Sequence, residues 1–210
     1  MTKKIPHKIH QIWVGPNPIP TKSKKFIKEI QKLHPDFEYK LWTDKDITKD
    51  NFDNYEFIKN SKSYAQKADI MRYEILYRHG GIYLDIDFEI FKNLEPLLTN
   101  ELVICSEDSF SSFHITNAFI ACTKHNPNLK RCVDGIKKVD FSKMINFATG
   151  PVFFKEHIIM NSHVTLLDSK VLYPVHWLQH KFHSFFGPVK YKKSSFSDET
   201  YGLHHWDHNW

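Results

Sequence analysis

Nine residues near the middle of the chain read Gly80-Gly81-Ile82-Tyr83-Leu84-Asp85-Ile86-Asp87-Phe88. Their apolar part, residues 82–84, is typical of a short buried strand, and two alternate aspartates follow it. If the strand continued, the side chains of Asp85 and Asp87 would lie on one face. Two carboxylates held that close repel each other unless a cation or protons neutralise them. We therefore expect a site for a hard divalent cation, with a metal-free turn capped by the two aspartates as the alternative.

Strands and helices are expected to alternate along the rest of the chain. Short apolar segments predict strands at 9–14, 37–42, 102–106, 118–122, 164–167 and 171–173, and helical spacing or capping residues predict helices over 21–34, over 63–79, from 127 and from 151. This alternation predicts an α/β fold, a three-layer sandwich with a mostly parallel central sheet. Residues 1–210 are expected to form a single domain, because there are no internal repeats and no linker.

The predicted helix 63–79 leads directly into the strand that precedes the aspartates. Asp69 and Arg72 are three residues apart on it, so they are neighbours on one side. They could form a surface ion pair worth about 0–1 kcal/mol. They could equally reach the carboxyl end of the strand, where ligands bind in open α/β sheets. The residues alone do not separate these two interpretations.

Charge and composition restrict the partners. The formal net charge is +5, but acidic residues are interleaved with the basic ones, which favours phosphate-bearing small molecules and gives no reason to expect nucleic acid. The first residues lack a signal-like apolar stretch, and no run approaches the roughly 18 apolar residues of a membrane helix. We expect no membrane span and a cytoplasmic location. Neither Gly-x-Gly-x-x-Gly nor a P-loop is present, so a nucleotide diphosphate would be neutralised by a metal and by side chains.

Taken together, these segments resemble the family 32 glycosyltransferases, the DXD-containing sugar transferases of the GT-A fold. The resemblance is carried by Ile9-His10-Gln11-Ile12-Trp13-Val14-Gly15, by residues 65–76 with Ala65-x-x-Ala68-Asp69-x-x-Arg72, by 80–87, by Asn117-Ala118-Phe119-Ile120, by Thr149-Gly150-Pro151, and by His204-His205-Trp206 with Trp210. The helix motif followed by Gly-Gly-x-Tyr-x-Asp-x-Asp is its most specific part. The resemblance implies a GT-A-like, Rossmann-type sandwich.

The resemblance also implies roles for individual residues. Trp13 would stack on the nucleotide base, a contact worth about 1–3 kcal/mol, although a buried core aromatic is the alternative. Asp69 and Arg72 would contact the donor sugar and the diphosphate. The expected catalytic residues are Asp69, Arg72, Asp85 and Asp87; the expected donor-binding residues are Trp13, Val14, Asp69, Arg72, Tyr83, Asp85, Asn117, His205 and Trp210; the expected metal ligands are Asp85, Asp87, His204, His205 and Asn209.

The C-terminal residues are expected to complete the metal shell and to become ordered with ligand, because disorder is the default at a chain end. Asn209 departs from the serine that the family often has there, which leaves its role open. Zinc held by His204 and His208 is less favoured, since no glutamate beside them resembles a metalloprotease motif.

The implied activity is that of a retaining glycosyltransferase that depends on Mn²⁺ or Mg²⁺. It would move a hexose from a nucleotide diphosphate sugar, UDP-linked as the first expectation, to a hydroxyl of a glycan, lipid or protein. Retention follows from the family alone, and no carboxylate nucleophile can be named, because Glu107 and Asp108 read as solvated loop residues. A nucleotide-sugar hydrolase and a catalytically idle sugar-nucleotide or glycan-binding protein remain as alternatives.

Overall fold

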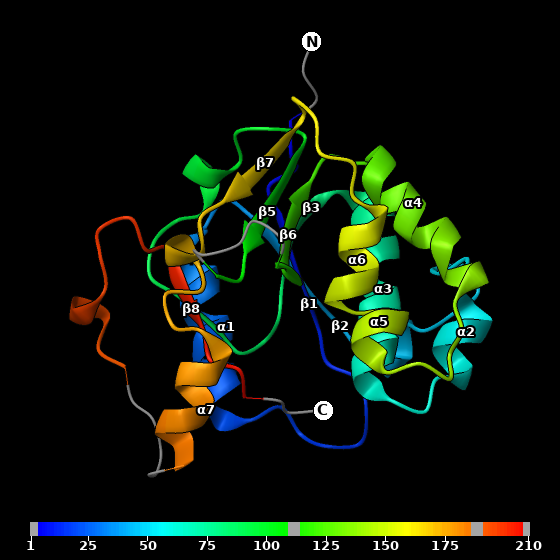
Figure 1. Ribbon diagram of the computed structural model, residues 1–210, viewed down its shortest axis with the longest axis horizontal. Coiled ribbons are helices and arrows are strands. Elements are labelled where there is room, and N and C mark those ends of the chain that lie inside the picture. Colours follow the sequence, from blue (N-terminus) through cyan, green and yellow to red (C-terminus); the bar gives the residue numbers. More distant parts are fainter. Residues whose placement is uncertain (1–3, 109–113, 186–190, 208–210) are drawn as a thin grey trace.

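The computed structural model describes residues 4–108, 114–185 and 191–207. Within them, six strands form a central sheet in the order β2-β1-β3-β6-β5-β7 (Figure 1). The strands are β1 Lys8–Ile12, β2 Glu38–Trp42, β3 Gly81–Leu84, β5 Leu102–Ser106, β6 Ile115–Cys122 and β7 Val164–Leu167. β1 is parallel to β2 and β3, and β5 is parallel to β7, whereas β6 is antiparallel to both of its neighbours. The predicted α/β fold with a mostly parallel sheet is confirmed.

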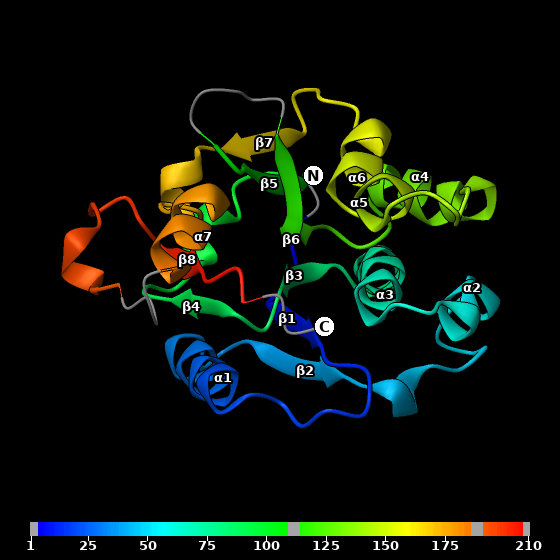
Figure 2. The ribbon, with the colours of Figure 1, turned by 60° about the horizontal axis from the view of Figure 1, so that its bottom comes forward.

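Helices cover both faces of this sheet. They are α1 Thr21–Leu33, α2 Tyr55–Asn60, α3 Tyr64–His79, α4 Pro127–Gly135, α5 Ile145–Ala148, α6 Pro151–His157 and α7 Trp177–Phe185. Helices α2 to α6 gather on one side, and α1, α7 and a small second sheet lie on the other (Figures 1 and 2). None of the helices within the described ranges is both long and apolar enough to cross a membrane.

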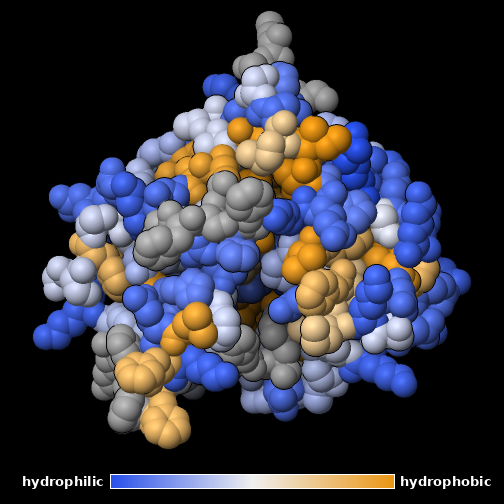
Figure 3. Space-filling view, in the orientation of Figure 1, coloured by the Kyte–Doolittle hydropathy of each residue, from blue (hydrophilic) through white to orange (hydrophobic). Residues whose placement is uncertain are grey.

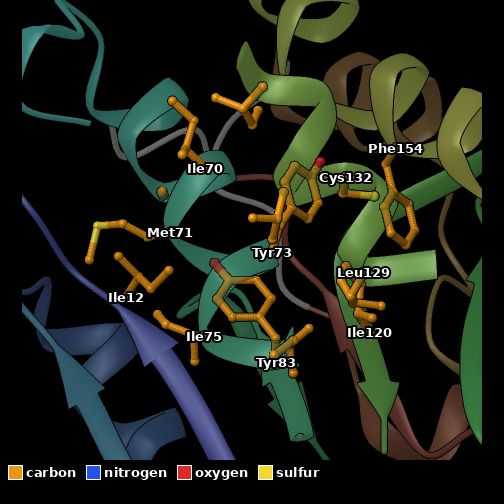
Figure 4. Close-up of a cluster of buried hydrophobic side chains, with 14 of the residues drawn as sticks. Ile12, Ile70, Met71, Tyr73, Ile75, Tyr83, Ile120, Leu129, Cys132 and Phe154 are labelled. Atoms are coloured by element: carbon orange, nitrogen blue, oxygen red, sulfur yellow. The ribbon is translucent and has the colours of Figure 1, made fainter. Parts of the chain in front are cut away.

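A separate hydrophobic core lies under each layer of helices. Tyr83 on β3 belongs to the core beneath α3, α4 and α6, together with Ile70, Tyr73 and Phe154 (Figure 4). Its neighbours on β3, Ile82 and Leu84, belong to the core on the other face. This alternation is the side-chain period of a strand, and it fixes which face of β3 looks toward α3.

The connection from α3 to β3 depends on two glycines. Ser63 caps the start of α3, and Gly80 ends it with φ of 64°. Gly81 follows with φ of 99°. A Cβ atom at Gly80 would lie 2.6 Å from the Lys124 backbone nitrogen, and one at Gly81 would lie 2.6 Å from the Lys8 carbonyl oxygen. Only glycine accommodates both the conformation and the close approach, so the helix can turn directly into a buried strand.

Two expectations about the second half of the chain were wrong. Residues 169–171 form a 3₁₀ turn capped by the Asp168 side chain, which accepts from the Lys170 N–H, so no strand runs over 171–173. The chain end is also not a loose tail up to Asp207. Gly202–His204 is a strand, β8, which pairs antiparallel with β4, Phe88–Ile90, to form the second sheet. The apolar residues of β4 can be recognised in the sequence, but its pairing with the distant β8 cannot be predicted from it.

Candidate metal and donor site

The two aspartates of the DXD motif lie in a tight turn. β3 ends at Leu84, and the Phe88 N–H donates to the Asp85 carbonyl oxygen at 3.2 Å. The strand therefore does not continue through the two aspartates. The turn nevertheless keeps the two carboxylates together, with an oxygen of each within 4.8 Å of the other.

His204 brings a third ligand to these aspartates. Its strand β8 pairs with β4, which starts one residue after Asp87, and His204 lies opposite Phe88 in the register. His204 Nε2 lies 3.0 Å from Asp87 Oδ1 and 3.8 Å from Asp85 Oδ2. One ligand atom from each of the three side chains lies within 4.8 Å of the others. His204 Nε2 is the nitrogen that faces the two carboxylates, and the buried Nδ1 makes no hydrogen bond to a described residue.

The donor set of this cluster, Asp85, Asp87 and His204, fits a divalent metal. Two carboxylates suit Mg²⁺ and Mn²⁺, and an imidazole suits transition metals. The Asp207 backbone N–H donates to Asp87 Oδ2 at 3.0 Å and fixes that carboxylate, as outer hydrogen bonds do for metal ligands. Asp207 is a contact that the sequence did not reveal.

For Asp87 and His204, burial and the attraction between the two side chains shift each pKa in opposite directions. Burial alone would raise the pKa of Asp87, but His204 lowers it below its usual range. Burial alone would lower the pKa of His204, but Asp87 raises it. Burial raises the pKa of Asp85, against the opposing effect of Arg72. A proton on His204 and a metal ion therefore compete for the same imidazole.

Asp69 and Arg72 form a buried ion pair next to this cluster. Arg72 Nη2 lies 3.2 Å from Asp69 Oδ1, and Arg72 Nη1 lies 3.2 Å from Asp85 Oδ1. Asp69 and Arg72 are 4% and 3% exposed. The interpretation as a surface ion pair was therefore wrong, because Arg72 instead joins the carboxylate on α3 to the first aspartate of the DXD motif.

Hydrogen bonds with two other segments, and a tyrosine on α3 itself, hold this ion pair in place. The Asn117 amide on β6 donates to Asp69 Oδ1 at 2.8 Å, and the Thr149 hydroxyl donates to Asp69 Oδ2 at 3.0 Å. Arg72 Nη1 donates to the Asn117 carbonyl oxygen at 2.7 Å. Tyr73 OH donates to the Thr149 carbonyl oxygen and accepts from the Asn117 amide. We call Asp69, Arg72, Asn117, Thr149 and Tyr73 the Asp69 network.

Sequence reasoning named Asp69, Arg72 and Asn117 but not Thr149 or Tyr73. The only available signal for Thr149 was the Thr-Gly-Pro triplet before α6, which is weak by itself. Tyr73 looked like any core aromatic of α3. Burial raises the pKa of Asp69 to about 6, although Arg72, Thr149 and Asn117 oppose the shift.

Tyr83 contacts both groups of residues. Its hydroxyl donates to Asp85 Oδ1 at 2.6 Å, and the Arg72 guanidinium lies 4.5 Å from the centre of its ring. Burial alone would lower the pKa of Arg72, but Asp85, Tyr83 and Asp69 raise it above its usual range. Arg72 is therefore a permanent positive charge beside Asp85.

Other predicted residues lie elsewhere. The His205 backbone N–H donates to the Asp87 carbonyl oxygen, but its side chain is directed elsewhere: Nε2 lies 2.8 Å from Glu89 Oε2 and the ring stacks on Phe26. Neighbouring residues along an extended chain point to opposite sides, so His204 and His205 cannot both face the turn. Asn209 and Trp210, like His208, lie outside the described residues.

The predicted base-stacking residue is largely buried. Trp13 is 7% exposed, and its indole N–H donates to the Asn17 carbonyl oxygen at 2.7 Å. Val14 packs in the core beneath α3. Next to them, a Cβ atom at Gly15 would lie 3.0 Å from the ring of Tyr64, so that ring covers the glycine. This burial agrees with the core-aromatic alternative for Trp13, and its contact with a base stays a prediction.

A cavity of about 800 Å³ adjoins the cluster. Trp206, Asp207 and Glu107 line it, together with residues of α5, α6 and α7. The Glu107 side chain is only 18% exposed and lies 3.8 Å from His176 Nε2, so it is not the solvated loop residue that was expected. Burial raises the pKa of Glu107. The cavity is large enough for a sugar-sized acceptor next to the DXD turn.

Comparison with known proteins places this geometry in a family. The sequence profile described as "Glycosyltransferase sugar-binding region containing DXD motif" matches residues 20–104. "Uncharacterized glycosyltransferase L373" of Acanthamoeba polyphaga mimivirus is 31% identical over 81% of this chain and 73% of its own length. "Inositol phosphoceramide mannosyltransferase 3" of Schizosaccharomyces pombe is 33% identical over 96% of this chain and 60% of its own length. The chain thus spans less than two thirds of that mannosyltransferase.

Solved structures share the fold. The "PaToxG Glycosyltransferase" superposes with a TM-score of 0.56 and 22% identity, covering 74% of this chain and 68% of its own. The UDP-bound glycosyltransferase domain of the YGT toxin superposes with a TM-score of 0.55 and 11% identity, covering 79% of this chain and 80% of its own. At these identities the comparison establishes the GT-A fold alone.

Proposed function

Because the chain belongs to the DXD-motif glycosyltransferases of the family 32 type, we propose that it transfers a hexose from a nucleotide diphosphate sugar to a hydroxyl acceptor with a bound divalent metal. The observation that carries this proposal is the convergence of Asp85, Asp87 and His204 from two distant segments. Because one ligand is an imidazole nitrogen, Mn²⁺ fits the cluster better than Mg²⁺. Asn209 remains a further candidate ligand.

The chemistry divides between the metal and the protein. A bound Mn²⁺ would supply positive charge for the diphosphate that leaves as the bond between the sugar C1 and oxygen breaks. Arg72 holds Asp85 in place and adds a fixed positive charge beside it. Asp69, oriented by Asn117 and Thr149, presents a buried carboxylate suited to accept hydrogen bonds from sugar hydroxyls. Trp13 and Val14 are proposed to line the base pocket.

The donor is the part of the proposal that most needs a test. A UDP-linked hexose was the first expectation, whereas the names of two relatives, "Inositol phosphoceramide mannosyltransferase 3" and "Mannosyl phosphorylinositol ceramide synthase SUR1" of Saccharomyces cerevisiae, specify mannose. Mannose linked to GDP therefore joins the UDP-hexoses as a candidate donor. The same names make a lipid hydroxyl the first acceptor to test among the lipid, glycan and protein classes.

The experiment is a turnover screen with purified protein. UDP-hexoses and GDP-mannose are supplied with Mn²⁺, with Mg²⁺ or with excess EDTA, and release of the nucleotide diphosphate is measured with and without an acceptor. We expect release that requires metal and increases with acceptor, with the anomeric configuration retained in the product by NMR. Equal release without acceptor would identify a hydrolase, and binding of a donor without any release would identify an idle binding protein.

A further inference from the structure

Exposed apolar side chains gather on two short helices that flank the 800 Å³ cavity. On α7, Leu178, Phe182 and Phe185 are exposed, the two phenylalanines by 65% and 86%. Their spacing of four and then three residues puts them on one face of the helix. At α5, Met144 and Phe147 are exposed by 71% and 50%. We call these five residues the apolar rim.

The two parts of the apolar rim lie on the same face of the molecule. Figure 3 shows apolar side chains over α7 and over α5, on either side of a hollow. The lining of the cavity connects them, because it includes Asn146 of α5 and Trp177, His180 and Lys181 of α7. A flat partner that covers both helices would therefore also cover the mouth of this cavity.

The chain around the apolar rim is basic. Residues 169–197, which include α7, contain five lysines and three histidines and no aspartate or glutamate, although Lys170 pairs with Glu199 and Lys193 donates to the Phe91 carbonyl oxygen. Next to α5, the exposed Lys143 directly precedes Met144, and Lys137 and Lys138 lie shortly before it, with one exposed acid, Asp140, between them. A second copy of the chain would bring like charges together on this face, which disfavours a homodimer. A negatively charged surface is complementary to it.

We propose that the apolar rim binds the surface of an anionic lipid bilayer. Aromatic and aliphatic side chains on a basic, acid-free helix are the combination that lies in the headgroup region of a membrane. Trp177, at the start of α7, is of the residue type enriched at that depth. The lysines add attraction to anionic headgroups, and this attraction is screened by salt.

This arrangement has a consequence for the acceptor. With α5 and α7 on the bilayer, the cavity beside the DXD turn opens toward the headgroups, so that a lipid hydroxyl is the acceptor within reach. That consequence rests on the proposed function, whereas binding to the bilayer does not.

The test measures co-sedimentation of the full chain with vesicles, without donor or metal. Vesicles of phosphatidylcholine alone are compared with vesicles that also contain phosphatidylserine. We expect binding to the anionic vesicles, weakened by salt, and a shift of tryptophan emission to shorter wavelength that is absent in Trp177→Phe. The double variant Phe182→Ser/Phe185→Ser should lose most of the binding, and Lys143→Gln should weaken it about fivefold.

A control is offered by Ile159 and Met160, two apolar residues that follow α6 and are 47% and 50% exposed. Ile159→Ser/Met160→Ser should bind as the unchanged protein does. The proposal would be overturned if the protein bound neutral and anionic vesicles equally, or if the control variant lost as much binding as the Phe182/Phe185 variant. It would also be overturned if the unchanged protein formed a dimer that the Phe182/Phe185 variant did not form.

Turnover of donor with a soluble acceptor, measured on the same variants, keeps the two proposals apart. It should be unchanged in Phe182→Ser/Phe185→Ser. A protein that binds vesicles but turns over no donor would refute the proposed function alone.

Discussion

Two buried polar clusters lie side by side at the end of β3, and they differ in how completely the protein satisfies them. In the Asp69 network, both carboxylate oxygens of Asp69 accept hydrogen bonds, and Arg72 contacts a carboxylate on each side. In the second cluster, Asp85, Asp87 and His204 place ligand atoms within 4.8 Å of one another, and His204 Nδ1 has no hydrogen bond to a described residue. Buried polar groups normally find partners.

This difference indicates that the Asp69 network positions other groups, whereas the cluster of Asp85, Asp87 and His204 binds a ligand. The Asp69 network has its partners built in, so it is rigid before any ligand arrives. The cluster of Asp85, Asp87 and His204 holds two like charges and one imidazole nitrogen without a described partner, which is costly unless a ligand completes it. Arg72 and Tyr83 connect the two clusters through Asp85. Substitutions in the Asp69 network should therefore lower both stability and activity. Substitutions in the cluster of Asp85, Asp87 and His204 should lower activity and metal binding.

The largest expected effect is on the open cluster. Asp87→Ala should abolish Mn²⁺ binding by isothermal titration and reduce turnover by at least about 10²–10³-fold, because a group that stabilises the leaving charge is lost. Folding should be retained, because the buried His204 that loses this partner can become neutral. Asp134→Ala, which removes an exposed carboxylate paired with Lys130, is the matched control and should change neither quantity. Full turnover in excess EDTA would contradict the metal assignment.

The next effect is on the ion pair of the Asp69 network. Arg72→Ala should lower the free energy of unfolding by about 3–5 kcal/mol, because Asp69 and Asp85 lose a buried partner. Arg72→Lys keeps the charge but cannot contact two carboxylates and a carbonyl in the same fork, so it should recover stability better than turnover. The measurements are urea unfolding and initial rates. Equal and near-normal values in both variants would show that the network does not matter.

A smaller effect isolates one hydrogen bond of the network. Thr149→Val removes the donor to Asp69 Oδ2 and keeps the shape, so it should cost about 1.5–3 kcal/mol in urea unfolding. Thr149→Ser keeps the hydroxyl and should cost less. If the two variants lose the same stability, the effect comes from packing and not from the hydrogen bond.

The smallest expected effect is on the pH dependence of stability, and it comes from the buried His10, whose pKa is shifted in the opposite direction to that of His204. His10 is satisfied as a neutral imidazole by Gly80 and Trp42, and burial lowers its pKa to about 4, whereas carboxylates raise the pKa of His204. Between pH 6.5 and 4 the unfolded chain binds a proton at His10 that the folded chain does not. The free energy of unfolding should therefore decrease as the pH is lowered through this window, by about 2 kcal/mol at pH 5.

The measurement is urea unfolding of the unchanged protein and of His10→Gln at pH 7.5 and pH 5. The variant should show the smaller loss on acidification, because it lacks this proton. An identical pH dependence in both proteins would contradict the role of His10.

Local patterns carried the sequence-based prediction of the fold. The 3.6-residue period of α3, its Ser63 cap and the glycine pair define the helix and its turn into β3, because all of these act over a few residues. The DXD turn was located for the same reason. The pairing of β4 with β8 was missed, since a three-residue strand has no pattern that names its distant partner.

The sequence by itself determined that Asp69, Arg72, Asp85 and Asp87 occur at the spacing of a sugar transferase on a helix and the strand that follows it. Only the tertiary structure decided that Arg72 is buried between two carboxylates and that His204, not His205, faces the DXD turn. The physical reason is that burial and ligand choice depend on contacts between segments far apart in the chain, which short periodic patterns do not encode.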